Sequence, residues 1–154
     1  MKLKAVFLEK DGSIITDAPN TDINELNSVS LSERVVEGLQ LLQSYGYLIV
    51  IVTNNQMAKV KKNIKGVCSK IGIYLDGFYR PQLLKEAAGD MDIDLANSWM
   101  IGDLENDVEE GRIAGCRTIY IDNGKGWSQG AGLNPQYQAT DLADAARYIL
   151  STNN

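Results

Sequence analysis

The sequence predicts an α/β protein built on a doubly wound, Rossmann-like parallel sheet with helices on both faces. Short apolar runs of strand length alternate along the chain with segments of helical periodicity. Three of these runs are rich in Val and Ile without strict alternation, which is typical of strands covered on both sides. The length of 154 residues, with 44% hydrophobic and 23% charged residues, favours one globular domain over residues 1–154.

Five apolar runs are expected to form the strands. They span residues 3–8, 47–52, 74–79, 99–102 and 118–121. The first crossover helix begins at a capping box, Ser30-Leu31-Ser32-Glu33, and Gly46 ends it. The other helices are expected over residues 59–70, 83–91, 104–114 and 141–150. Two polar segments, 16–27 and 122–137, are predicted to be loops on the same edge of the sheet.

Charge and composition exclude several classes of protein. A net charge of −5 argues against nucleic acid or an anionic membrane surface as the main partner. No apolar run approaches the ~20 residues of a membrane span, and the first residues do not resemble a signal peptide, so a cytoplasmic protein is expected. The chain has no histidine, which excludes imidazole bases and Ser-His triads. Its two cysteines, Cys68 and Cys116, are expected to be small core residues in a reducing compartment.

Carboxylates follow two of the predicted strands. Glu9 and Asp11 come after the first strand, and Asp103 and Asp107 come after the fourth. Ligands of open parallel sheets bind outside the carboxyl ends of the strands, and hard carboxylate oxygens are what Mg²⁺ prefers. Asp103 and Asp107 could instead be only helix N-terminal acids, and Asp11 only a turn residue. Their joint position favours a metal site.

The second strand is followed by groups that suit a phosphate. Thr53 supplies a hydroxyl group, and Asn54 supplies a backbone N–H near the expected start of a helix. Each residue type is also common in ordinary loops and helix caps. Their position beside the carboxylates favours phosphate binding.

These motifs resemble those of the haloacid dehalogenase (HAD) superfamily. The matching segments are Glu9-Lys10-Asp11-Gly12-Ser13, Val52-Thr53-Asn54 and the Gly102–Asp107 segment, GDLEND. The superfamily pattern is DxDG[TS] after the first strand, Thr or Ser after the second, a later Lys, and GDxxxD after the fourth. The Ala5–Leu8, Asp94–Asp103 and Asp107–Thr118 segments further resemble the branch with heptose bisphosphate phosphatase and histidinol phosphatase. The resemblance covers nearly the whole chain.

The resemblance implies a Mg²⁺-dependent phosphatase that acts on a small phosphorylated metabolite such as a sugar phosphate. Residue 9 would attack phosphorus, and Asp11 would protonate the leaving oxygen and later activate water. Mg²⁺ would lie among Glu9, Asp11, Asp103 and Asp107, with the Asp11 carbonyl as a further ligand. Thr53 and Asn54 would hold the phosphate.

The sequence departs from the superfamily pattern in three ways. Position 9 is Glu where the pattern has the nucleophilic Asp. The extra methylene group moves the carboxylate by about 1 Å, and a displacement of that size can lower the rate about 10²-fold. The lysine-containing segment of this branch is missing, and Arg80 is the positional candidate for its charge. Other candidates for this charge are Lys10, Lys59, Lys61, Lys62 and Lys85. The Cys/His zinc loop of heptose bisphosphate phosphatases is also absent, and the segment between Thr53 and Arg80 is too short for a large cap domain.

Two other functions remain as alternatives. A catalytically inactive HAD-like domain with a metal-binding, phosphate-binding, regulatory or assembly role would explain Glu9 and the missing lysine segment. A response-regulator receiver would also place acids at strand ends, but its lysine would have to be Lys125, and the GDxxxD segment would go unexplained. In the glycine-rich loop, Trp127 could stack on a ligand or hold the loop against the body of the protein, and we favour the second.

Overall fold

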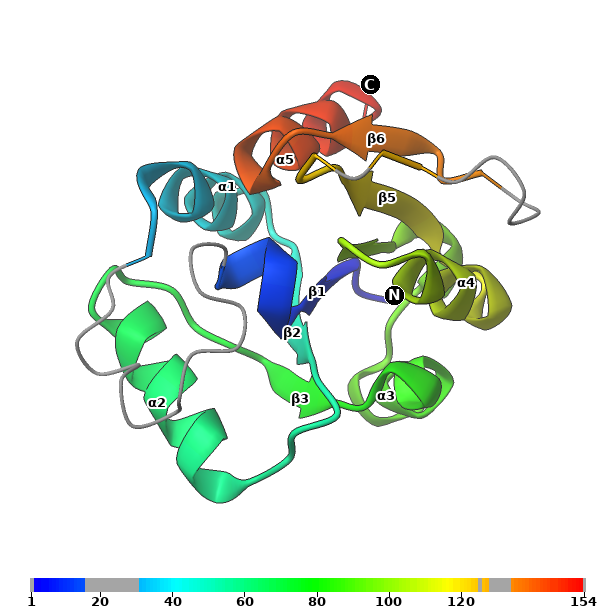
Figure 1. Cartoon of the computed structure of the whole chain (residues 1–154). Coiled ribbons are helices and arrows are strands. Elements are labelled where there is room, and N and C mark those ends of the chain that lie inside the picture. Colours follow the sequence, from blue (N-terminus) through cyan, green and yellow to red (C-terminus); the bar gives the residue numbers. More distant parts are fainter. Residues whose placement is uncertain (1, 16–30, 125, 128–133, 154) are drawn as a thin grey trace.

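The protein forms one six-stranded parallel sheet, seen in a computed structural model that describes residues 2–15, 31–124, 126–127 and 134–153 (Figure 1). Its strands are β1 (Ala5–Glu9), β2 (Leu48–Val52), β3 (Gly77–Tyr79), β4 (Trp99–Gly102), β5 (Arg117–Ile121) and β6 (Tyr137–Ala139). The strand order is β3-β2-β1-β4-β5-β6, and every neighbouring pair is parallel. The order therefore reverses at β1, because the chain first builds outward to β3 and then returns to β4.

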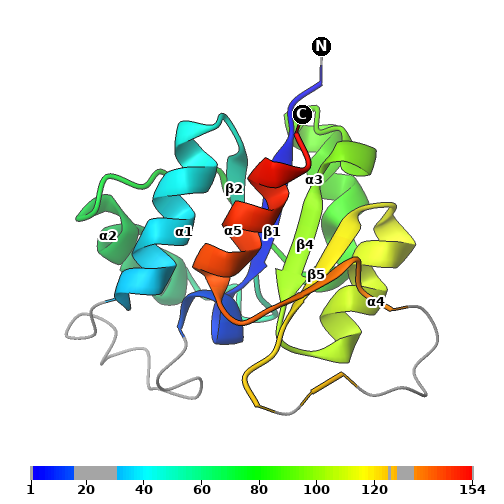
Figure 2. The ribbon, with the colours of Figure 1, turned by 90° about the horizontal axis from the view of Figure 1, so that it is seen from above.

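Helices cover both faces of the sheet. They are α1 (Glu33–Ser44), α2 (Ala58–Ser69), α3 (Leu84–Met91), α4 (Glu105–Ala114) and α5 (Leu142–Ser151). One core packs α1, α2 and α5 against the sheet, and a second packs α3 and α4 against the other face (Figure 2). Strand β1 contributes side chains to both cores: Val6 and Leu8 lie in the first core, and Ala5 and Phe7 lie in the second. The predicted doubly wound fold is confirmed.

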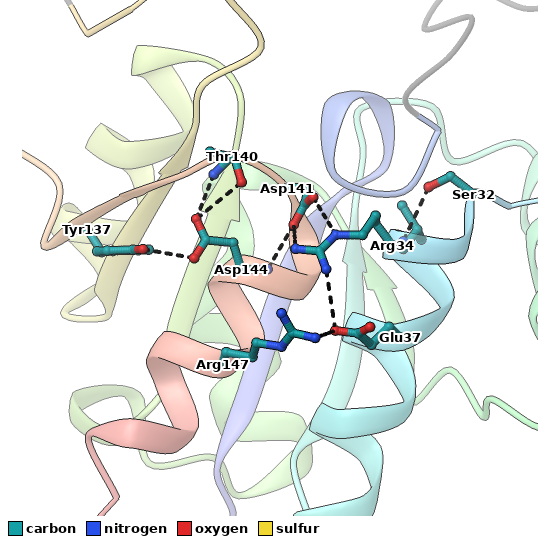
Figure 3. A network of polar contacts seen from close by, with 9 residues as sticks. Ser32, Arg34, Glu37, Tyr137, Thr140, Asp141, Asp144 and Arg147 are labelled. Carbon is teal, nitrogen blue, oxygen red and sulfur yellow. Dashed lines mark hydrogen bonds and ion pairs between the residues drawn. The ribbon is translucent and has the colours of Figure 1, made fainter.

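Helices α1 and α5 pack closely because of a glycine in α1. A methyl group added at Gly38 would lie 2.8 Å from the backbone carbonyl carbon of Leu142, so a larger residue has no room there. The Arg34 guanidinium adds a two-point contact, with its Nε 2.7 Å from Oδ2 of Asp141 and its Nη2 3.1 Å from Oδ1 (Figure 3). Asp141 is also the N-cap of α5. The start of α5 is therefore joined directly to α1.

Ion pairs continue along the same two helices. Glu37 of α1 pairs with Arg147 of α5, and Arg34 Nη1 lies 3.7 Å from the Glu37 carboxylate (Figure 3). On the far side of α5, the Asp144 carboxylate accepts a hydrogen bond from the Tyr137 hydroxyl at 2.8 Å, which ties α5 to β6. These contacts link α5 to both of its neighbours. Because they are exposed, each contributes only about 0–1 kcal/mol to the free energy of unfolding.

The observed elements differ from the predicted ones in a few places. The structure adds β6, whose first residue, Tyr137, is the last residue of the predicted loop; the three residues of this strand carry too little apolar pattern to indicate a strand. Strand β3 is only three residues long, half of the predicted 74–79 run. Helix α1 is capped by Ser32, whose side chain accepts from the backbone N–H of Val35 at 3.3 Å. The predicted cap Ser30 and the loop over 16–27 lie outside the described residues.

The connection from β2 to β3 contains a single helix, α2. All residues of this connection are described, so no cap domain is inserted there, as the sequence predicts. In the part of the chain that the structure describes, no helix is both long and apolar enough to cross a membrane.

The close approach of α1 and α5 gives a test of the packing. We expect Gly38→Ala to lower the free energy of unfolding by about 1–3 kcal/mol, because the added methyl group collides with α5 backbone atoms that cannot rotate away. Gly66→Ala is the matched control, since Gly66 is also inside a helix but a methyl group there meets nothing within 4 Å. It should gain about 0.5–1 kcal/mol from helix propensity. Urea unfolding of both variants would contradict this account if they shifted in the same direction.

Candidate active site

The site lies at the carboxyl ends of β1 and β4, where the strand order reverses. Parallel pairing of Val6, Phe7 and Leu8 with Trp99, Met100 and Ile101 brings the ends of the two strands together. Connections leave these two ends toward opposite faces of the sheet, which opens a crevice between them. Both carboxylate-bearing segments of the sequence begin at this crevice.

The turn after β1 holds Asp103 against its backbone. This turn covers Lys10–Ile14, and Gly12 has a φ of 95°, which favours glycine. A methyl group at Gly12 would lie 2.1 Å from Cγ of Asp103, so the Asp103 carboxylate packs directly on the turn. The Ser13 hydroxyl donates a hydrogen bond to the carbonyl oxygen of Ile101 at 3.1 Å and ties the turn to β4. Any larger residue at position 12 would displace the Asp103 carboxylate.

Asp107 is buried at the start of α4, with only 2% of its surface exposed. Its Oδ2 accepts a hydrogen bond from the backbone N–H of Leu104 at 3.0 Å. It also packs on a glycine, because a methyl group at Gly102 would lie 2.3 Å from the same oxygen. Asp107 therefore caps its helix, as the macrodipole favours, and at the same time faces the crevice residue Glu9.

Glu9 and Asp107 form a pair of carboxyl groups that cannot both be ionised easily. Burial raises the pKa of Glu9 to about 8, and the charges of Asp107 and Asp11 add to the rise. Burial likewise raises the pKa of Asp107 to about 7, although hydrogen bonds from the Leu104 N–H and from Glu9 oppose the rise. Because burial and their mutual repulsion disfavour two charges here, the raised pKa values favour protonation of this pair near neutral pH when no cation is present.

The Asp11 side chain is partly exposed and lies beside Lys10. Its side chain is 40% exposed, and its Oδ1 lies 3.3 Å from Nζ of Lys10, whose side chain is only 13% exposed. The same Oδ1 is buried and accepts no hydrogen bond from the described residues. Lys10 thus places a positive charge inside the site, next to the carboxylate predicted to handle protons.

Thr53 and Arg80 lie at the neighbouring strand ends. Thr53 is 3% exposed, its N–H bonds to the Tyr79 carbonyl at 3.0 Å, and its Oγ1 accepts from the N–H of Asn55 at 3.0 Å. Nη1 of Arg80 donates to the Asn54 carbonyl at 2.9 Å, which holds the guanidinium beside the loop that follows β2. Helix α2 begins at Ala58, one residue before its predicted start, so Asn54 lies in the short loop that leads into this helix, as expected.

The donor set fits Mg²⁺ in its chemistry. Buried carboxylates with raised pKa values are groups that a hard cation would stabilise. Within the described ranges, no three Asp, Glu, Cys or His side chains are grouped so that they could together hold a metal ion. Mg²⁺ is usually bound through one or two carboxylates, with waters and phosphate oxygens as further ligands. The ligand set of Glu9, Asp11, Asp103 and Asp107 stays a prediction.

One contact of the site was missed at the level of sequence. Nδ2 of Asn123, in the loop after β5, donates a hydrogen bond to Oδ2 of Asp103 at 3.1 Å. Asparagine is common in loops, so no sequence signal separates this residue from an ordinary turn former. The expectation for Trp127 in the same loop is confirmed as far as its protein contact goes, because its ring packs edge-on against Tyr120 at 5.1 Å.

Comparisons with known proteins agree with this geometry. Residues 79–145 match the family model described as HAD-hydrolase-like. The D-glycero-beta-D-manno-heptose-1,7-bisphosphate 7-phosphatase of Pasteurella multocida (strain Pm70) is 25% identical, over 95% of this chain and 96% of the relative. The D-glycero-D-manno-heptose-1,7-bisphosphate 7-phosphatase of Thermosynechococcus vestitus is 27% identical, over 97% and 96% of the two chains.

A solved structure shows the same fold. The D,D-heptose 1,7-bisphosphate phosphatase of B. bronchiseptica, crystallised with magnesium and phosphate, superposes with a TM-score of 0.78 at 17% identity, covering 97% of this chain and 99% of the other. The fold and the carboxylates at its β1/β4 edge thus define a protein like those of the HAD superfamily. Within that superfamily the chain resembles the heptose bisphosphate phosphatases, as its motifs predict.

The raised pKa values of Glu9 and Asp107 predict how stability depends on pH. Both carboxyl groups have a higher pKa in the folded than in the unfolded chain, so folding binds protons and the free energy of unfolding falls as pH rises from about 4 to about 8. We expect a loss of at least about 1 kcal/mol, or roughly 3 °C in Tm, between pH 5 and pH 8 in chelator. No histidine titrates in this window. Thermal unfolding over this pH range measures the effect.

Asp107→Asn is the matched variant for this measurement. It keeps an oxygen that can accept from the Leu104 N–H but removes the charge that faces Glu9. Its unfolding temperature should depend less on pH than that of the unaltered protein. Equal slopes for the two proteins would show that the Glu9–Asp107 pair does not take up a proton on folding.

Proposed function

We propose that the chain is a Mg²⁺-dependent phosphomonoester hydrolase of the HAD type, acting on a small phosphorylated metabolite of the sugar-phosphate class. The proposal takes residues 1–154 as a single catalytic domain that works in the cytoplasm. One observation carries it: Asp11, Thr53, Asp103 and Asp107 follow three strands that are neighbours in the sheet, and the order of the strands reverses among them. The heptose bisphosphate phosphatases to which the chain is similar support the substrate class.

The residues of the chain divide the work between covalent and proton-transfer roles. An ionised Glu9 attacks phosphorus to form an acyl phosphate on its own side chain, and the leaving oxygen departs with a proton from Asp11. Asp11 then accepts a proton from the water that hydrolyses the acyl phosphate. Lys10, whose Nζ is 3.3 Å from Oδ1 of Asp11, holds this carboxylate in place for both steps.

Thr53, Asn54 and Arg80 bind the phosphate group. The Thr53 hydroxyl oxygen accepts one backbone hydrogen bond, and its O–H is the donor for a phosphate oxygen. The Arg80 guanidinium, positioned by the Asn54 carbonyl, has further N–H groups for phosphate oxygens. Asp103 and Asp107 would hold Mg²⁺, together with the Asp11 carbonyl and one oxygen of Glu9. When bound, the ion supplies positive charge that neutralises the phosphate and lowers the pKa values of the buried carboxyl groups.

One observation favours the second candidate, a HAD-like domain without catalytic activity. A protonated Glu9 is not a nucleophile, and burial together with Asp107 raises the pKa of Glu9 to about 8. Glu9 must therefore lose its proton, and part with Asp107, before it can attack. If the phosphate and the cation do not achieve this, the chain would bind a metal or a phosphate without turnover.

Phosphate release distinguishes the two candidates. We expect the unaltered protein to release phosphate from a panel of heptose bisphosphate, other sugar phosphates and an aryl phosphate, with Mg²⁺ but not with chelator. Asp11→Asn should abolish turnover, because the leaving oxygen then has no acid. Glu9→Asp should raise the rate by about 10²-fold if the extra methylene misplaces the carboxylate.

The controls decide between a weak enzyme and an inactive domain. An inert unaltered protein with an active Glu9→Asp variant would mean a phosphatase scaffold disabled at one residue. If neither protein releases phosphate from any substrate of the panel, the hydrolase proposal is contradicted, and the result supports the domain that binds without turnover. Turnover that survives Asp11→Asn would refute the assigned mechanism.

Arg80 gives a separate test of phosphate binding. We expect Arg80→Met to raise KM by about 10- to 100-fold with a smaller change in kcat, because a charge-assisted contact to the substrate is lost. Lys70→Met is the charge-matched control at the far end of α2 and should leave KM unchanged. An unchanged KM for Arg80→Met, with a raised KM for Lys85→Met, would assign the phosphate charge to Lys85 instead.

A further inference from the structure

We propose that Asn123 is a positioning residue for the metal site, and that its side-chain amide orients the Asp103 carboxylate for the cation. The inference rests on the proposed function, since it concerns the Mg²⁺ that the hydrolase would use. The observation that supports the inference is a hydrogen bond of 3.1 Å, which Nδ2 of Asn123 donates to Oδ2 of Asp103. The two residues are 20 positions apart and follow different strands, β4 and β5.

The sheet register explains why Asn123 reaches Asp103. Gly102 at the end of β4 pairs directly with Tyr120 of β5, so the residues that follow each strand leave the sheet side by side. Strand β5 continues one residue further, to Ile121, and the N–H of Asp122 still bonds to β6 through the Ala139 carbonyl at 2.8 Å. Asn123 is the first residue beyond this ladder. It is therefore free to turn toward the end of β4.

The loop that carries Asn123 is held in place by its own contacts. Oδ1 of Asp122 accepts hydrogen bonds from the N–H groups of Gly124 and Gly126, both at 2.9 Å. The Tyr120 hydroxyl donates to the Gly126 carbonyl at 3.1 Å, and the Trp127 ring packs on the Tyr120 ring. These bonds surround Asn123 on both sides in sequence. Its amide is thus presented from a fixed loop, which reduces the entropy lost on orienting Asp103.

Asp103 is held from both neighbouring strands. Strand β4 lies between β1 and β5, and the turn after β1 packs the Gly12 backbone against the Asp103 carboxyl carbon. The loop after β5 adds the Asn123 amide on Oδ2. A donor held on one oxygen fixes the rotation of the carboxylate, and with it the direction from which the carboxylate meets the cation. Such outer contacts typically contribute 10- to 100-fold in metal affinity.

The test is the affinity for Mg²⁺ alone, measured by isothermal titration calorimetry on metal-free protein at pH 7.5. We expect Asn123→Ala to raise the Kd for Mg²⁺ by about 10-fold or more, since the carboxylate loses its orienting donor. Asn123→Gln keeps an amide on a longer stem and should recover part of the affinity. Asn97→Ala is the matched control: the Asn97 amide also donates to an aspartate, Asp94, at 2.7 Å, but at the opposite edge of the sheet.

A kinetic readout separates positioning from a general structural role. In an active background the Asn123→Ala variant should need more Mg²⁺ for half-maximal rate, while KM for the phosphate ester at saturating Mg²⁺ stays within about 2-fold. Its unfolding temperature in chelator should match that of Asn97→Ala, because both side chains are surface amides.

The outcomes distinguish this inference from the function on which it depends. If the unaltered protein and Asn97→Ala bind Mg²⁺ and Asn123→Ala binds it equally well, the role of Asn123 is refuted and the hydrolase proposal stands. If the unaltered protein binds no Mg²⁺ at all, both are refuted. A weaker Kd in Asn123→Ala with partial recovery in Asn123→Gln supports the positioning role.

Discussion

The parallel pairing of β1 with β4 brings together two segments that are about 90 residues apart in the chain, and the site depends on it. The pairing is reinforced at both ends. The N–H of Ala5 donates to the Ser98 hydroxyl at 2.9 Å, and the Ser13 hydroxyl donates to the Ile101 carbonyl at 3.1 Å. Because β4 and the first four residues of β1 are buried, these two polar contacts support the register that the backbone pairing sets. A shift of one residue would exchange the two faces and separate the glycines from the carboxylates that pack on them.

Most of the fold could be predicted because its strongest signals are local. The Ile-Val run of β2 and the spacing of Val35, Leu39 and Leu42 in α1 reflect burial that each segment carries in its own residues. Strand β6 carries no such signal, since Gln138 is exposed and the strand is held by its neighbour β5 rather than by an apolar pattern. Element ends were shifted by a few residues for the same reason, as the choice of Ser32 as N-cap shows.

The site could be predicted at the level of strand ends but not of atoms. The sequence indicates that Glu9 and Asp107 share an edge, because parallel strands end together. It does not indicate that the added methylene lets Glu9 contact Asp107, since that depends on how far α4 lies from β1. Asn123 was missed for a similar reason: its role arises from the register of β4 with β5 and not from its own residue type. Contacts between side chains of different loops are therefore the part of a site that cannot be predicted from a single sequence.

The placement of the two tryptophans gives the molecule two separate optical probes. Trp99 lies in the core with 1% exposure, edge-on to Tyr148 at 5.9 Å, whereas Trp127 is partly exposed in the loop that carries Asn123. A collisional quencher dissolved in water contacts only indoles that are exposed to solvent. It should therefore quench the fluorescence of Trp127 but not that of Trp99. The fluorescence of this chain can therefore follow the loop beside the carboxylates independently of the core, without an attached label.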